Sequence, residues 1–124
     1  MANSHQLFGQ SGEAVALDHL KKNGYRILAS NYRTPLGEID IIARDKDTLV
    51  FAEVKTRHSD RYGSPKWAIT PQKKRKLSML ALYYLKTAHL MHQKARFDVV
   101  SILAHGPDKW DIEIIKNAFD LSYP

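Results

Sequence analysis

Apolar residues recur with helical or strand spacing along most of the chain and predict its elements in order. In the first third, the spacing predicts a helix over Leu7–Asn23 that ends at the following glycine. A strand is predicted over Tyr25–Tyr32, and the turn residues of Pro35–Gly37 lead into a hairpin over Gly37–Arg57. The amino-terminal part therefore combines one helix with three consecutive strands.

The second half begins with a clear helix start. Thr70 is a favourable N-cap, and Pro71 suits the first helical position. Two more strands are predicted over Phe97–Leu103 and Trp110–Ile115. The order α-β-β-β-α-β-β predicts an α/β fold with a mixed five-stranded sheet, in which the second helix crosses over right-handedly. The predicted buried stripe of this helix contains Leu77, Leu80, Ala81, Tyr84, Leu85 and Ala88.

The hairpin holds carboxylates among its apolar residues. With Lys46-Asp47 as its tip and Asp45 paired with Thr48, Asp40 lies directly opposite Glu53. Two carboxylates roughly 4 Å apart repel each other by about 1 kcal/mol in water and about 4 kcal/mol at an effective dielectric near 20. A hard divalent cation offsets this repulsion, because carboxylate oxygens are its preferred ligands.

The same register leaves a simpler interpretation open. It places Glu38 opposite Lys55, which is also consistent with a solvated strand face that carries one cross-strand ion pair. Glu13 adds a further acid, since it stands one helical turn before Leu17 and two turns before Leu20. A carboxylate on an apolar stripe costs free energy unless it is paired or coordinating, although its head group can also reach solvent at the stripe's edge.

Composition restricts the class of protein and its chemistry. The 124 residues, 44% hydrophobic and 26% charged, predict one globular domain over residues 1–124. The chain has no cysteine, which excludes disulfides, zinc–thiolate sites and thiol nucleophiles. The start MANSHQLFGQ lacks a secretory signal pattern, and no apolar run is long enough to span a bilayer. We therefore expect a cytoplasmic protein without a membrane partner.

The net charge of +6 is concentrated in one segment. Residues 55–76 hold eight Lys and Arg and one acid, whereas the rest of the chain holds eleven bases and twelve acids. A basic patch is the usual electrostatic feature of a protein that binds a phosphate backbone, although a solvated basic helix end has the same composition. The candidate nucleic-acid contacts are Arg57, Arg61, Lys66, Lys73, Lys74, Arg75 and Lys76.

A helical Glu, an Asp and a later strand with Glu-x-Lys follow one another along the chain. These are Glu13, Asp40 and Glu53-Val54-Lys55, and they resemble the PD-(D/E)XK nuclease superfamily, although no proline precedes Asp40. The chain resembles more closely the uncharacterised YraN-like family of predicted endonucleases, which is related to archaeal Holliday-junction resolvases. This resemblance covers nearly the whole chain through GEAVALDHLKKNGYRILASNYRTPLGEIDIIARD, LVFAEVKTR, the Pro71–Leu85 helix and RFDVV.

The resemblance implies a restriction-endonuclease-like fold and a metal-dependent endonuclease that hydrolyses phosphodiester bonds of nucleic acid. DNA is the expected substrate, including branched repair or recombination intermediates. The resemblance implies that Asp40 and Glu53 hold Mg²⁺ or Mn²⁺ near the Val54 carbonyl, with Glu13 completing the ligands directly or through water. Lys55 would orient the attacking water or stabilise negative charge on the phosphorane.

Glu38 and Gln72 are expected around this site. Glu38 belongs to the GEID stretch and would pair with Lys55 or support the metal ligands, and Gln72 lies at the start of the second helix. A non-catalytic nucleic-acid-binding module with the same fold is the alternative function. A protein-interaction domain with a structural acidic cluster is a third. Cleavage of both strands of a symmetric junction would suit a two-fold homodimer.

Overall fold

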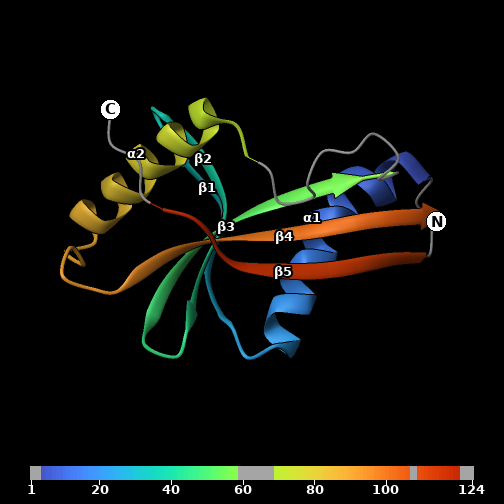
Figure 1. Ribbon diagram of the computed structural model, residues 1–124, viewed down its shortest axis with the longest axis horizontal. Coiled ribbons are helices and arrows are strands. Elements are labelled where there is room, and N and C mark those ends of the chain that lie inside the picture. The colour runs from blue at the N-terminus through green and yellow to red at the C-terminus, as the bar shows by residue number, and fades with distance from the viewer. Residues whose placement is uncertain (1–3, 59–68, 107–108, 121–124) are drawn as a thin grey trace.

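The computed structural model describes residues 4–58, 69–106 and 109–120 (Figure 1). Within them, two helices and five strands follow the predicted order, which is therefore confirmed. Their bounds are α1 Ser4–Lys22, β1 Arg26–Thr34, β2 Gly37–Asp45, β3 Thr48–Arg57, α2 Pro71–Thr87, β4 Ala95–Gly106 and β5 Lys109–Phe119.

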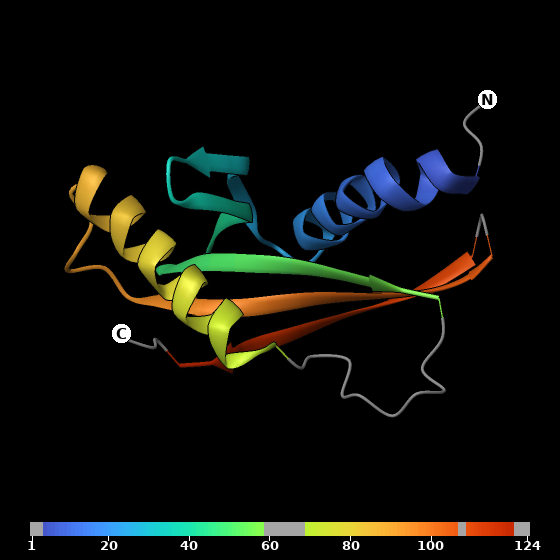
Figure 2. The ribbon, with the colours of Figure 1, turned by 90° about the horizontal axis from the view of Figure 1, so that it is seen from above.

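The five strands form one mixed sheet in the order β1-β2-β3-β4-β5. β3 and β4 run parallel, as expected for strands joined through the α2 crossover, and the other neighbours are antiparallel. α1 and α2 pack on two separate core clusters, one on each face of the sheet (Figures 1 and 2). The predicted α/β fold with a mixed five-stranded sheet is confirmed.

Helix α2 begins where its sequence predicts. Thr70 caps it by accepting a hydrogen bond from the Lys73 N–H at 3.1 Å, and Pro71 follows directly. Most of the predicted stripe is buried, but Ala88 is exposed because the helix ends at Thr87. The apolar side chains that α2 buries against the sheet are Leu77, Leu80, Ala81 and Leu85.

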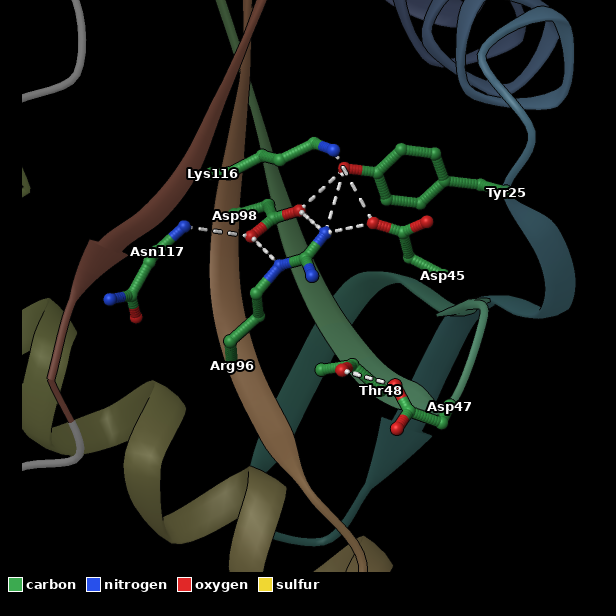
Figure 3. Close-up of polar contacts among 8 residues, drawn as sticks. All are labelled: Tyr25, Asp45, Asp47, Thr48, Arg96, Asp98, Lys116 and Asn117. Carbon is green, nitrogen blue, oxygen red and sulfur yellow. Dashed lines mark hydrogen bonds and ion pairs between the residues drawn. The ribbon is translucent and has the colours of Figure 1, made fainter.

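A buried polar network, called here the Arg96 network, joins the α1–β1 junction, the end of β2 and strands β4 and β5 (Figure 3). Arg96 donates to Asp98 at 2.9 and 3.1 Å and to Asp45 at 2.6 Å. The fully buried Asp98 also accepts from the Tyr25 hydroxyl at 2.8 Å and from the Asn117 N–H at 3.0 Å. Every charge in this network therefore has partners, as a buried charge requires.

The predicted hairpin register is confirmed from the tip as far as Ile41–Ala52. β2 and β3 pair from Asp45–Thr48 to Ile41–Ala52, so the next step of the ladder would place Asp40 opposite Glu53. The ladder ends there, because β2 curves away with β1 while β3 continues beside β4 (Figure 2). The two diverging strands form a fork, which is defined here by Asp40 on one arm and Glu53 on the other.

Part of the expected basic segment, including Arg61 and Lys66, lies outside the described residues. None of the helices that the structure describes combines the length and the apolar character needed to cross a bilayer.

Candidate functional site

The carboxylate of Asp40 stands inside the fork. Its Oδ2 accepts a hydrogen bond from the backbone N–H of Val54 at 2.8 Å. This side chain therefore satisfies a strand N–H just beyond the point where the β2–β3 ladder has ended. Because the bond ties Asp40 to the opposite arm, the carboxylate is oriented before any ligand arrives.

Glu53 stands on the other arm, close enough to Asp40 for the two carboxyls to hydrogen-bond when one is protonated. Its side chain is only 16% exposed. Burial and, next, the negative charge of Asp40 raise the pKa of Glu53 to about 7, while the Lys73 ammonium, 3.3 Å away, opposes this rise. The two carboxylates share one side of the sheet, as the register predicts.

Glu13 approaches the same cluster from α1. The helix comes close to β3 at Gly12, where an added Cβ would lie 3.2 Å from the Thr56 hydroxyl oxygen. Burial and then the charge of Asp40 raise the pKa of Glu13, whereas a hydrogen bond with the Asn31 side chain lowers it. The inward orientation predicted from the helix face therefore agrees with the structure.

Two carboxylate oxygens of this cluster have no hydrogen-bond partner in the described parts of the chain. Among the described side chains, Glu13 Oε1 and Glu53 Oε2 are buried without a hydrogen bond, which costs free energy unless a donor or a cation meets them. Mg²⁺ or Mn²⁺ fits this donor set, because hard cations bind carboxylate and carbonyl oxygens. No group of three acidic or histidine side chains in the described parts is arranged to hold an ion alone, so water and phosphate oxygens would complete the ligands.

Lys55 and Val54 lie in the fork as part of β3. Lys55 is half-buried and follows Glu53 by two residues, the spacing that places both on one face of a strand. Val54, between them, is the residue whose N–H binds Asp40. The structure therefore brings Asp40 and Glu53 together, and the strand spacing places Lys55 on the same face of β3 as Glu53.

Glu38 lies near the fork, because its charge, after burial and the charge of Asp40, also raises the pKa of Glu13, whereas Gln72 lies at the start of α2. Glu38 is paired in register with Arg33 of β1 and forms an ion pair with it at 3.3 Å. The predicted opposition of Glu38 and Lys55 is wrong, because the β2–β3 ladder ends before it reaches these positions. Gln72 is exposed in the first turn of α2.

The basic residues of α2 do not form one continuous surface. Consecutive helical residues project at intervals of about 100°, so Lys73–Lys76 point in different directions. Lys74 lies 5.9 Å from the centroid of a ring on β5, Lys76 lies over Gly37, and Arg75 is exposed. Arg57, on β3, is half-buried, and its Nε has no hydrogen-bond partner among the described residues.

Two residues of the site were not predicted as part of it. Lys73, assigned from sequence to the basic segment, contacts Glu53 in the fork. Lys73 lies one helical turn before Leu77, a residue of the buried stripe of α2. This spacing is the signal that could have identified it. Asn31, which contacts Glu13, has a φ of 52°, a conformation that Asn adopts more readily than most residues, and no sequence pattern marks it.

Comparison with known proteins extends over most of the chain. Residues 12–102, which include every residue of the fork, match a model of the uncharacterised protein family UPF0102. The chain is 52% identical over 120 residues to a UPF0102 protein of Desulfosudis oleivorans, covering 97% of this chain and 95% of that protein. A UPF0102 protein of Syntrophus aciditrophicus is 51% identical, with 93% and 90% covered. One of Clostridium acetobutylicum is 46% identical, with 91% and 93% covered.

Proposed function

This chain belongs to the uncharacterised protein family UPF0102, the YraN-like family that its sequence resembles, and we propose that it is a Mg²⁺- or Mn²⁺-dependent endonuclease acting on DNA. The observation that supports this most is the approach of Asp40 to Glu53 in the fork, where Glu53 Oε2 is buried without a hydrogen-bond partner among the residues that the structure describes. Two partly buried carboxylates held together destabilise a fold unless a cation or a shared proton joins them, and the Lys73 ammonium pairs with only one oxygen of Glu53. A ligand site explains the fork better than a structural role does.

Each residue of the fork would have its own role in phosphodiester hydrolysis. Asp40 and Glu53 would hold the ion, with the Val54 carbonyl nearby and Glu13 reaching it through water. When bound, such an ion acidifies a water ligand and neutralises charge on a phosphate oxygen. The Val54 N–H keeps Asp40 in position. Lys55 would hold its ammonium close to the negative charge that develops on the phosphate.

The arrangement of the elements also supports this function. An acid from α1 and two acids from the diverging central strands β2 and β3 meet at one place, which supports grouping the chain with the restriction-endonuclease-like nucleases. Residues 55–76 hold eight bases and one acid, a surplus that suits contact with a phosphate backbone. DNA, linear or branched, is therefore the substrate that we propose.

Asp40→Asn tests the chemistry. The substitution keeps the shape of the side chain and an oxygen that accepts the Val54 N–H, but it removes the charge that would hold the ion. We expect metal-dependent cleavage to fall by orders of magnitude, because water activation and phosphate positioning both depend on the ion. DNA affinity in EDTA should be equal or higher, because one negative charge near the phosphates is gone. Labelled linear, branched and single-stranded DNA would be incubated with Mg²⁺, Mn²⁺ or EDTA and resolved on denaturing gels.

Asp47→Asn is the matched control, since Asp47 is an exposed acid at the tip of the same hairpin, and it should cleave like the wild type. Near-wild-type turnover by Asp40→Asn, with contaminating nuclease excluded, would contradict the proposed site. DNA binding without cleavage in any metal would favour the non-catalytic nucleic-acid-binding module. No DNA affinity at low salt would favour a protein-interaction domain.

A further inference from the structure

The side chain of Lys73 belongs to the acidic fork more than to the basic surface. It lies on the helix face of Leu77 and Leu80, because residues four and seven positions apart share a face, and that face packs on the sheet. Its ammonium stands 3.3 Å from Glu53 Oε1. Thr70 holds this end of α2 by accepting the backbone N–H of Lys73. The packing of α2 on the sheet therefore places the Lys73 side chain at the fork.

The electrostatic surroundings of the Lys73 ammonium differ between the metal-free and the metal-bound site. Without one, its ammonium offsets part of the negative charge of Asp40 and Glu53. A divalent ion at these two carboxylates would carry a charge equal and opposite to theirs. The ammonium would then face a neutralised site and the repulsion of the ion itself. Its side chain is 46% exposed on a flexible four-carbon stem, so it is able to turn toward solvent.

We propose that Lys73 is a phosphate contact that metal binding releases: it pairs with Glu53 without metal and turns to the DNA backbone when the ion is bound. This inference rests on the proposed function, because it takes the fork as a metal site. Arg75 differs, since it is exposed, forms no ion pair with the described residues, and would contact phosphate in both states. By linkage, metal and DNA strengthen each other's binding, and Lys73 carries part of that coupling.

The test compares Lys73→Gln with Arg75→Gln in DNA binding. Affinity for a labelled duplex is measured by fluorescence anisotropy at several salt concentrations, once in EDTA and once in Ca²⁺, a hard cation with oxygen ligands. Gels verify that the DNA stays intact. In Ca²⁺, Lys73→Gln should reduce the magnitude of the log–log salt slope by about 0.9 relative to wild type, the contribution of one phosphate contact. In EDTA, Lys73→Gln and wild type should have the same salt slope. Arg75→Gln should reduce the magnitude of the slope by the same amount in EDTA and in Ca²⁺.

Binding of Mn²⁺ to the DNA-free proteins, followed by electron paramagnetic resonance, gives a second readout. Lys73→Gln should bind Mn²⁺ several-fold more tightly than wild type, because no ammonium then competes for Glu53. Lys73→Arg should keep most of the coupling between Ca²⁺ and DNA, since it keeps the charge.

Two results would overturn the role of Lys73 alone. One is a slope change of equal size in EDTA and Ca²⁺, which would make Lys73 an ordinary backbone contact. The other is a Lys73→Gln protein with wild-type slopes in both conditions. If wild type binds Mn²⁺ in either case, the proposed metal site stands. If wild type binds no Mn²⁺ and Ca²⁺ leaves its DNA affinity unchanged, both proposals fail together.

Discussion

The sheet carries two clusters of buried and half-buried carboxylates, which differ in how fully their charges are matched. In the Arg96 network, Asp98 accepts four hydrogen bonds and Asp45 contacts two cations (Figure 3). In the fork, Asp40 and Glu53 approach each other, Lys73 contacts one oxygen of Glu53, and the other oxygen is buried without a hydrogen-bond partner among the described residues. Carboxylates within one small protein thus have different electrostatic surroundings.

The direction of the pKa shifts follows from this difference. A hydrogen bond from Arg96 lowers the pKa of Asp45, whereas burial raises the pKa values of Glu13 and Glu53. A carboxyl with a lowered pKa stabilises the fold at neutral pH, and one with a raised pKa destabilises it. The network therefore holds the structure together, and the fork persists despite its cost in stability, as is common at functional sites.

Removal of Asp98 should have the largest effect on stability. Asp98→Ala deprives Arg96, the Tyr25 hydroxyl and the Asn117 N–H of their shared acceptor. Because breaking a buried pair costs about 3–5 kcal/mol, urea denaturation should show a free energy of unfolding lower by that amount. Asp111→Ala removes an exposed acid of β5 and should change it by less than about 0.5 kcal/mol. Equal effects of the two substitutions would show that Asp98 stabilises the fold no more than an exposed acid does.

The network should weaken in acid through Asp45. Since its folded-state pKa is lowered, Asp45 stabilises the fold above its unfolded value of about 3.8, and this stability is lost as the pH falls through the folded pKa. The loss should be on the order of 1.5 kcal/mol, the scale of a hydrogen bond to a charged group. Urea denaturation at a series of acidic pH values should show a shallower decline for Asp45→Asn than for wild type. Parallel curves would show that Asp45 contributes no such stability.

Asp40→Asn should have the smallest effect on stability, and in the opposite direction. It relieves repulsion with Glu53 and Glu13 while keeping an acceptor for the Val54 N–H. In EDTA at neutral pH, the free energy of unfolding should stay equal or rise by up to about 1 kcal/mol, the scale of a cross-strand pair. A clear loss of stability would place Asp40 with the stabilising carboxylates and end the contrast between the two clusters.

Much of the fold could be predicted because its signals are local. Thr70 and Pro71 mark the start of α2, and the two-residue hairpin tip sets the register that directs Asp40 toward Glu53. Strand pairing beyond Ile41–Ala52 could not be predicted in this way, because β2 and β3 separate before they reach Glu38 and Lys55. Where a strand leaves its neighbour depends on the packing of the whole sheet.

The Arg96 network could not be predicted as a network. The Tyr25–Asp98 bond joins residues 73 positions apart, and the Arg96–Asp45 bond joins residues 51 positions apart. Periodicity within a strand carries no information about such distant partners. For the same reason, the sequence predicts Lys73 as part of the basic segment, whereas the position of α2 places its ammonium beside Glu53.

By itself, the sequence determined which elements form and the face on which Glu13, Asp40 and Glu53 lie, because helix and strand periods depend only on neighbouring residues. Only the tertiary structure decided which charges meet and which stay unmatched. It matched Asp98 by bringing Arg96 and Tyr25 to it, and it left one oxygen of Glu53 buried without a hydrogen-bond partner among the described residues. Electrostatic energy depends on distance and burial in space, and both are set when the helices and the sheet pack together.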